Sequence, residues 1–197
     1  MNEKNLKPAS VFYYFEEICK VPRPSKREEK IIAYLKAFGR EHGLETKTDE
    51  VGNVLIKKPA TPGKENLKTV ILQSHIDMVC EKNSDVEHDF LIDPIETAVS
   101  YTHLRAHETV VDGEWLKAKG TTLGADNGIG VATELAILAA TDIEHGPLEC
   151  LFTVDEETGL TGAFALKPGF MTGDILINLD SEDEGELFIG CAGGANT

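Results

Sequence analysis

Short apolar runs alternate with helical patterns along this chain, and this alternation restricts the fold more than any other feature of the sequence. Two segments near the N-terminus have apolar residues at helical spacing, and a later segment is apolar almost all round. The expected helices are Val11–Ile18, Ile31–Phe38, Ile129–Ala140 and the short Thr161–Leu166; the expected strands are Asn53–Ile56, Thr69–Leu72, Leu148–Val154 and Asp174–Leu179. Strands that alternate with helices indicate an α/β fold, here a three-layer α/β/α sandwich with a mostly parallel sheet.

The second predicted helix carries its own boundary signals. Ser25 and Glu28 form an S-x-x-E pattern, which predicts a capping box at the N-terminus of the helix. Gly39 and Gly43 are expected to close it. The proline-containing stretch Lys58–Lys64 is expected to form a loop between the first two strands.

The composition argues against several classes of partner. With 19 basic and 34 acidic side chains, the chain has a formal net charge of −15, and a surface this negative repels phosphate backbones and anionic lipid head groups. We therefore expect neither a nucleic acid nor a membrane as partner. Met1–Ser10 has no apolar stretch of signal-peptide length and the four cysteines form no C-x-x-C pair, so the sequence predicts a cytoplasmic protein with reduced, largely buried cysteines.

Polar and acidic residues follow three of the predicted strands, and others precede the third helix. Parallel sheets bind ligands beyond the carboxyl ends of their strands, so these residues are expected to meet at one edge. Each has a simpler interpretation when taken alone, as a core histidine, a helix N-cap or a solvated acidic turn. Carboxylates gathered at one edge, however, repel one another unless a cation neutralises them. The residues concerned are His75, Asp77, Asp126, Asp155, Glu156, Glu157 and Asp180.

This set of side chains predicts a site for two zinc-like ions. We expect His75 to bind one ion, Asp126 to bridge both ions and Asp180 to complete the first; Glu157 is assigned to the second ion. Asp77 lies two residues after His75 and is expected to accept a hydrogen bond from the other ring nitrogen, which fixes the tautomer. Glu156 is expected to take a proton from the attacking water and pass it to a leaving amine.

Three motifs resemble those of the cytosolic Xaa-His dipeptidases, also called aminoacyl-histidine dipeptidases, of the M20 metallopeptidase group. The motifs are Leu72-Gln-Ser-His-Ile-Asp-Met-Val-Cys80, Gly124-Ala-Asp-Asn-Gly128 and Asp155-Glu-Glu-Thr-Gly159, and the resemblance extends over nearly the whole chain, including Gly113–Ala118. The resemblance implies a zinc-exopeptidase-like fold and hydrolysis of Xaa-His and other dipeptides with two divalent metal ions, Zn or alternatively Co or Mn. It places His75, Asp126, Glu157 and Asp180 on metal positions, and Asp77 and Glu156 on the catalytic pair.

Two departures from the family pattern follow from the same resemblance. The family's last metal ligand is a distant C-terminal histidine that lies beyond a lid and dimerisation domain, and none of the six histidines here matches it. We therefore expect residues 1–197 to be the N-terminal part of the catalytic domain, truncated before the lid, and homodimerisation to belong to the parent protein. The second departure is internal, because removing Ala98–Thr109 restores the family pattern and shortens the His75-to-Asp126 spacing from 51 to 39 residues. The core of this segment, Ser100–Thr109, resembles translated sequencing-adapter DNA, so a foreign insertion that forms a loop is expected.

Two further interpretations remain open at this point. An amino-acid deacylase of the same metallopeptidase group would use the same ligands with a different lid, and hydrolysis of Ala-His compared with N-acetyl amino acids separates the two activities. The alternative outside the enzymes is a non-catalytic fragment that binds at most a metal ion. An open sheet edge and an uncovered apolar face are expected for such a fragment.

Overall fold

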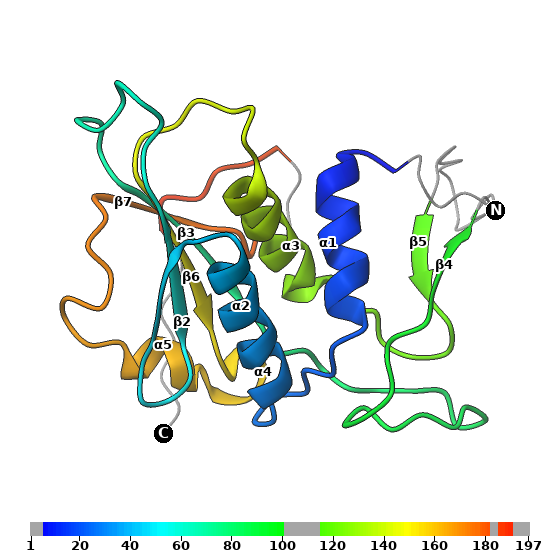
Figure 1. Ribbon diagram of the computed structural model, residues 1–197. Helices are drawn as coiled ribbons and strands as arrows, with labels where there is room; N and C mark the ends of the chain where they lie inside the picture. The colour runs from blue at the N-terminus through cyan, green and yellow to red at the C-terminus, as the bar shows by residue number, and fades with distance from the viewer. Residues whose placement is uncertain (1–5, 101–114, 182–184, 191–197) are drawn as a thin grey trace.

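A five-stranded sheet forms the centre of the molecule (Figure 1). The computed structural model describes residues 6–100, 115–181 and 185–190. The strands are β1 (Glu45–Thr48), β2 (Val54–Lys58), β3 (Val70–His75), β6 (Leu148–Thr153) and β7 (Ile175–Asn178), in the spatial order β1-β2-β6-β3-β7. The helices are α1 (Ala9–Cys19), α2 (Glu29–Glu41), α3 (Ala125–Ala139), α4 (Glu156–Gly159) and α5 (Thr161–Ala165).

Four of the five strands run in the same direction. Strands β6 and β7 both pair with β3 in parallel, whereas β2 is antiparallel to its neighbours β1 and β6. The predicted α/β class with a mostly parallel sheet is therefore confirmed, with β2 as the reversed strand. Because β3, β6 and β7 are parallel neighbours, their carboxyl ends lie at one edge of the sheet.

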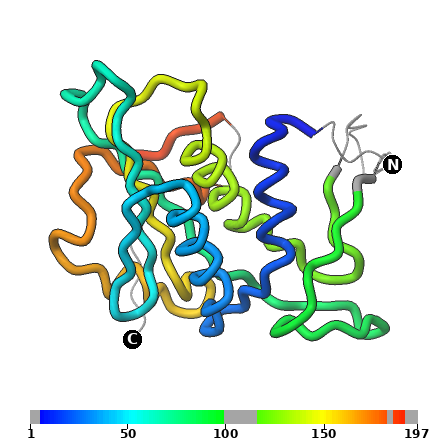
Figure 2. Tube along the Cα trace, viewed as in Figure 1, coloured from blue at the N-terminus to red at the C-terminus, as the bar shows by residue number. Residues whose placement is uncertain are grey.

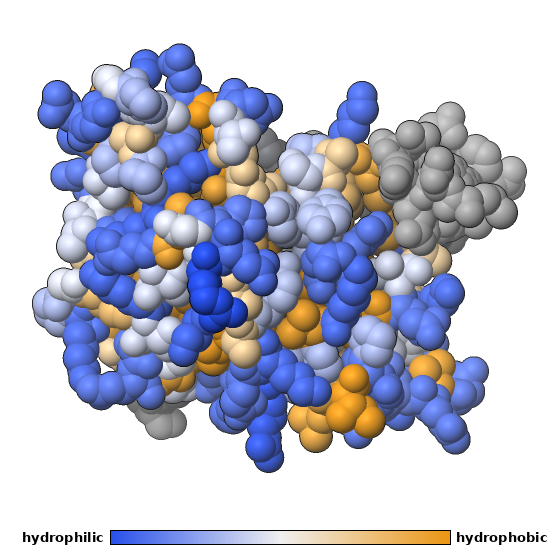
Figure 3. All heavy atoms as spheres, viewed as in Figure 1, coloured by the Kyte–Doolittle hydropathy of each residue, from blue (hydrophilic) through white to orange (hydrophobic). Residues whose placement is uncertain are grey.

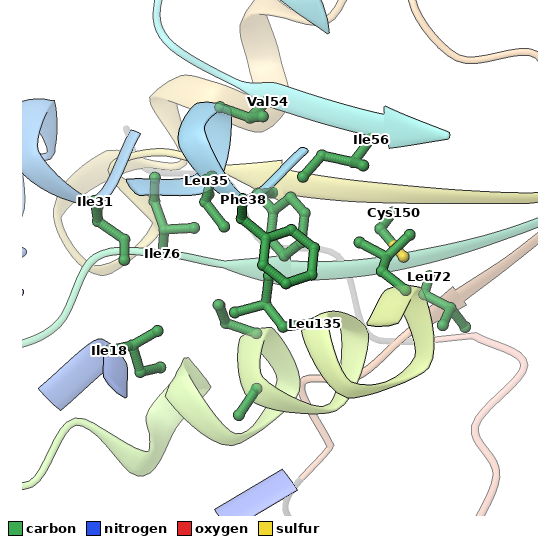
Figure 4. Close-up of a cluster of buried hydrophobic side chains, with 14 of the residues drawn as sticks. Ile18, Ile31, Leu35, Phe38, Val54, Ile56, Leu72, Ile76, Leu135 and Cys150 are labelled. Carbon is green, nitrogen blue, oxygen red and sulfur yellow. The ribbon is translucent and has the colours of Figure 1, made fainter. Parts of the chain in front are cut away.

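Helices α2 and α3 pack on one face of this sheet and α1 packs against α3, so that the main core lies between these helices and the strands (Figures 1 and 4). Phe15 and Ile18 of α1, together with Leu35 of α2, are almost completely buried there. Alternate residues of the strands point to this face, as the two-residue period of a strand requires. They include Val54, Ile56, Leu72, Cys150 and Phe152.

The opposite face of the sheet has a much thinner cover. Leu55, Ile71 and Leu151 form a small buried cluster there, packed against Leu166, Phe170 and Met171 from the segment that follows α5. Strand β7 is an edge strand, and its residues Ile175–Ile177 are each more than 40% exposed. Among the described residues, β7 therefore leaves one side of the sheet without a neighbouring strand.

Strands β4 (Thr97–Ser100) and β5 (Trp115–Ala118) form a separate antiparallel pair, on the far side of α1 from the main sheet (Figures 1 and 2). The prediction of a loop over Ala98–Thr109 is therefore wrong for Ala98–Ser100, because these residues have ladder partners in Trp115–Lys117. Residues 101–109 of that segment lie outside the described residues.

The surface and the cysteines agree with the composition. Hydrophilic residues occupy most of the face shown in Figure 3, with apolar residues between them. Cys19 and Cys150 are buried and Cys80 is partly buried, and all three are free thiols; Cys191 lies outside the described residues. Within the part of the chain that the structure describes, no helix is long and apolar enough to cross a membrane.

The predicted boundaries of the second helix differ from those observed. Helix α2 begins at Glu29 without a side-chain cap, because Lys26 adopts a left-handed backbone conformation (φ 66°) that separates Ser25 from the first turn. The capping-box prediction is therefore wrong. Gly39 lies inside the helix, where a Cβ atom would approach Thr46 Oγ1 to 2.0 Å, so its role is to admit β1 rather than to end α2. Gly43, with φ of 64°, follows the end of the helix as expected.

Glu134 of α3 is an acidic residue whose side chain lies in the interior of the protein. Its side chain is completely buried, and neither carboxylate oxygen has a hydrogen-bond partner. Burial raises the pKa of Glu134 well above its ordinary value, and the neighbouring Ser74 hydroxyl opposes this shift only in part. The folded protein therefore holds the proton of Glu134 to a higher pH than the unfolded chain does.

Glu134→Leu is expected to stabilise the protein at neutral pH, because it removes an unpartnered carboxyl group from the core. An acid with a raised pKa in the folded state costs stability progressively as the pH rises above its unfolded value of about 4.5. The gain in unfolding free energy should be about 1–3 kcal/mol at pH 7 and smaller at pH 4.5. Urea unfolding at the two pH values measures it, and equal stability of variant and wild type at pH 7 would show that Glu134 has a partner in solution.

Candidate metal centre

The candidate site lies at the edge of the sheet where β3, β6 and β7 end. Strand β3 ends at His75, whose side chain is 1% exposed, and the chain then continues to the fully buried Asp77. Strand β6 is followed by Asp155 and α4, and β7 is followed by Leu179 and Asp180. The parallel register of the three strands thus brings these residues together.

The Nε2 atom of His75 faces a group of carboxylates. It lies 3.1 Å from Asp126 Oδ1, 3.8 Å from Asp180 Oδ1 and 4.0 Å from Glu156 Oε2. Two sets of three ligand atoms, each set within 4.8 Å, include this imidazole: one with Asp126 and Asp180, the other with Glu156 and Glu157. One imidazole among oxygen ligands is a donor set suited to zinc and similar divalent ions.

The other ring nitrogen of His75 is held by Asp77. Nδ1 lies 3.2 Å from the Asp77 carbonyl oxygen and 3.3 Å from Asp77 Oδ1. Burial alone would lower the pKa of His75, but the hydrogen bond to Asp77 and the nearby Asp180 and Asp126 outweigh it and raise the pKa to about 9. Acceptors at Nδ1 favour a proton there, which in the neutral ring leaves Nε2 free as a ligand.

Asp77 also positions the helix that carries the two glutamates. Its carboxylate accepts hydrogen bonds from the backbone N–H groups of Glu156 (3.0 Å) and Glu157 (3.2 Å) and from the Ser25 hydroxyl (2.7 Å). Burial would raise the pKa of the Asp77 carboxyl, but the hydrogen bonds from His75, Ser25 and Glu156 lower it to about 2. Asp77 therefore remains a carboxylate that fixes both the imidazole and the start of α4.

Asp126 enters the site because the first residues of α3 are not helical. Its ψ of 114° departs from helical geometry, and the residue at the helix N-cap is Gly124. Asp126 therefore does not cap α3, and its carboxylate turns to His75. The next residue, Asn127, donates to Asp180 Oδ1 at 2.6 Å and to the Leu179 carbonyl oxygen at 3.1 Å, which joins the start of α3 to the end of β7.

Three other carboxylates of the site, those of Glu156, Glu157 and Asp180, have pKa values above those of exposed carboxyl groups. Burial raises the pKa of Glu156, Glu157 and Asp180, and the negative charge of Asp126 adds to the effect in each case. A cation would neutralise this mutual repulsion. An open pocket of about 460 Å³ lies beside these groups, lined partly by Asp126, Glu156 and Asp180, so a ligand has access to them.

No protein-family model matches the chain. It is 50% identical over 189 residues to the cytosol non-specific dipeptidase of Escherichia coli K12, which covers 96% of this chain and 36% of that protein. The crystal structure of an aminoacylhistidine dipeptidase from Vibrio alginolyticus superposes with a TM-score of 0.87 and 52% identity, covering 97% of this chain and 36% of that one.

The predicted resemblance to the cytosolic dipeptidases is confirmed. The chain spans about a third of the length of these relatives. An aminopeptidase, PepT from Bacillus cereus, is a more distant neighbour with a TM-score of 0.69 and 27% identity over 88% of this chain and 43% of its own. The zinc-exopeptidase-like α/β architecture implied by the motifs thus agrees with the solved structures of peptidases.

Every residue predicted for the site lies around His75 or its neighbour Asp77, but the sequence analysis missed several supporting groups. Asn127 is one of these groups, and its place next to Asp126 in the motif Gly124–Gly128 was the only sequence signal for it. Ser25 and Glu28 were assigned to a capping box. They instead contact Asp77 and the backbone N–H of Asp155, across 52 and 127 residues of sequence, and no local pattern indicates such contacts.

Proposed function

We propose that this chain carries the metal-binding and catalytic residues of a cytoplasmic dipeptidase that uses two divalent metal ions, most simply zinc. The observation that carries the proposal is the gathering of His75, Asp126 and Asp180 within 4.8 Å at the strand ends, in a chain that is 50% identical to a dipeptidase. His75, Asp126 and Asp180 would hold one ion, and Glu157, with Asp126 as bridge, the other. The donor set of one imidazole and several carboxylates fits such ions.

In this proposal the chain's own residues orient the ligands and move the proton. Bound zinc supplies a Lewis acid that polarises the peptide carbonyl and makes water acidic enough to attack near neutral pH. Asp77 holds the His75 ring through Nδ1 and holds α4 through two backbone N–H groups. Glu156 borders the open pocket with a partly exposed carboxylate, where it accepts the proton of the attacking water and delivers it to the leaving amine.

The substrate of the whole protein is proposed to be a dipeptide, including those that end in histidine. The test is hydrolysis of Ala-His compared with that of an N-acetyl amino acid, using the enzyme expressed from the complete gene. Preference for Ala-His supports the dipeptidase, whereas preference for the N-acetyl substrate supports an M20-type deacylase. The parent protein is also proposed to form a homodimer, which size-exclusion chromatography with light scattering measures.

We also propose that Ala98–Thr109 is a foreign insertion in the first part of a catalytic domain. The natural chain would then join Thr97 directly to Val110. Resequencing the source gene across codons 90 to 115 tests this. Absence of the twelve codons supports the proposal, and their presence in the genomic DNA contradicts it.

His75→Ala is expected to lower the Co²⁺ affinity of this chain by more than about 100-fold, because His75 is shared by both candidate ligand sets. Loss of a metal ligand should cost more than loss of a group that only orients one, which typically costs 10–100-fold. Calorimetric titration with Co²⁺ measures the change. His145→Ala is the matched control, because His145 binds the Gly146 carbonyl oxygen instead of a carboxylate. Equal Co²⁺ affinity in the two variants would refute the assignment of His75 as ligand.

A further inference from the structure

Arg23 is a buried cation that no part of the proposed mechanism uses. Arg23 is only 3% exposed. Within the described residues it forms no ion pair at 4.0 Å or less, and its guanidinium instead donates to backbone carbonyl oxygens. Burying a charge without a carboxylate partner costs stability, so the contacts that it makes require an explanation.

These contacts join two loops that carry proposed metal ligands. One terminal nitrogen, Nη1, donates to the carbonyl oxygens of Ile76 and Asp77, each at 3.2 Å. The other, Nη2, donates to the carbonyl oxygen of Gly124 at 2.5 Å. The first two acceptors directly follow His75. The third, Gly124, lies two residues before Asp126 and 101 residues after Arg23 in the sequence.

On each side, the carbonyl oxygen that accepts from Arg23 also contacts the loop of a proposed metal ligand, His75 on one side and Asp126 on the other. The Asp77 carbonyl oxygen that accepts from Arg23 is the same atom that lies 3.2 Å from His75 Nδ1. The Gly124 carbonyl oxygen also accepts the backbone N–H of Gly128, which closes the turn that contains Asp126. The planar guanidinium reaches both loops because its donors diverge from one rigid group, which the ammonium of lysine does not provide.

The glycines on either side of Asp126 leave room for this group. A Cβ atom on Gly124 would lie 2.5 Å from Arg23 Nη2, and one on Gly128 would lie 2.6 Å from it. Gly124 also has a φ of 69°, which disfavours other residues there. Two glycines of the Gly124–Gly128 motif are therefore packed against the Arg23 side chain.

We propose that Arg23 is a positioning residue that holds His75 Nε2 and Asp126 Oδ1 at their distance of 3.1 Å. It acts through the Asp77 carbonyl oxygen on one side and the Gly124 carbonyl oxygen on the other. It touches neither substrate nor metal. This inference rests on the proposed metal site for its purpose, but the geometry it predicts is measurable in the metal-free protein.

The first experiment compares Arg23→Met with wild type by long-range ¹H–¹⁵N spectra of the metal-free chain labelled at histidine. Arg23→Met is expected to change the Nδ1 and Nε2 signals of His75, because the carbonyl that faces Nδ1 loses its second donor. The matched control is Lys58→Met, which removes another cation that donates to two carbonyl oxygens, those of Ile137 and Ala140 at the far end of α3. It should leave the His75 signals unchanged. Unchanged His75 signals in folded Arg23→Met would overturn the proposal.

The second experiment titrates the same variants with Co²⁺ alone. Affinity should fall about 10–100-fold in Arg23→Met, as is typical when a group that orients a ligand is removed, and should remain at the wild-type value in Lys58→Met. A purely structural role of Arg23 would instead lower the melting temperature of Arg23→Met while its Co²⁺ affinity stayed at the wild-type value. If wild type itself binds no Co²⁺, the proposed metal site fails, while the His75 spectra still decide the role of Arg23.

Gly128→Ala provides the test if Arg23→Met does not fold. The added Cβ atom enters the space of Arg23 Nη2 and displaces the guanidinium while the charge is kept. The same change of the His75 signals is expected. A folded Gly128→Ala variant with wild-type His75 signals would overturn the proposal.

Discussion

Glu156→Gln is expected to lower dipeptide hydrolysis by about 10²–10⁴-fold while the metal ions remain bound. The amide keeps the size of the side chain but accepts no proton at neutral pH. The backbone N–H of Glu156, which donates to Asp77 at 3.0 Å, is unaffected by the substitution, so α4 should keep its position. The measurement is kcat for Ala-His in the enzyme expressed from the complete gene, with the metal content determined on the same sample.

The pH dependence of the wild-type enzyme belongs to the same prediction. Burial and the surrounding carboxylates raise the pKa of Glu156, so in the metal-free chain it loses its proton at a higher pH than an exposed glutamate. Bound cations would oppose this shift. Loss of the Glu156 proton gives the wild-type profile of rate against pH its acidic limb. In Glu156→Gln, whose rate is low, this limb should be absent. Glu45→Gln on β1, whose side chain is exposed, serves as control. Near-normal turnover of Glu156→Gln with metal bound would assign the proton transfer to another group.

The site could be predicted from sequence because its residues follow a rule of parallel sheets. His75, Asp155 and Asp180 each lie at or just beyond the end of an apolar run, and the carboxyl ends of parallel neighbours necessarily meet. The strand pattern alone therefore indicated which polar residues converge. It did not require knowledge of any contact between distant segments.

The parts that could not be predicted depend on contacts between segments far apart in the chain. Strand β1, with the sequence Glu-Thr-Lys-Thr, is mostly exposed and has no apolar alternation, and it forms because β2 offers a free edge. Arg23 follows the first helix in a proline-flanked turn, and only the fold shows that its acceptors lie 53, 54 and 101 residues away. Local patterns record local conformation, so interactions of this kind leave no periodic signal.

Asp77→Asn is expected to reduce both stability and metal affinity, because one buried carboxylate supports the imidazole and the start of α4. Asparagine keeps one acceptor oxygen, but its amide nitrogen would face a donor among His75, Ser25 and the backbone N–H groups of α4. Removing one partner of a buried ion pair costs about 3–5 kcal/mol. Urea unfolding of the metal-free chain at pH 6 measures this loss.

The dependence on pH separates the charge of Asp77 from its shape. The pKa of Asp77 is lowered to about 2 from an ordinary value of 3.8, so its charged form stabilises the folded state by about 2 kcal/mol above pH 3.8. This contribution is lost as the pH falls from 3.8 towards 2. The difference in stability between wild type and Asp77→Asn should therefore narrow below pH 4, and a constant difference across that range would mean that charge is not the cause.

Asp49→Asn is the matched control for the loss of metal affinity. Asp49 likewise accepts several backbone N–H groups, those of Val51, Gly52 and Asn53, but it lies in the turn between β1 and β2. Both variants should lose stability, whereas the Co²⁺ affinity should fall about 10–100-fold only in Asp77→Asn. Equal Co²⁺ affinities in the two variants would show that Asp77 supports only the fold and does not orient His75 for metal binding.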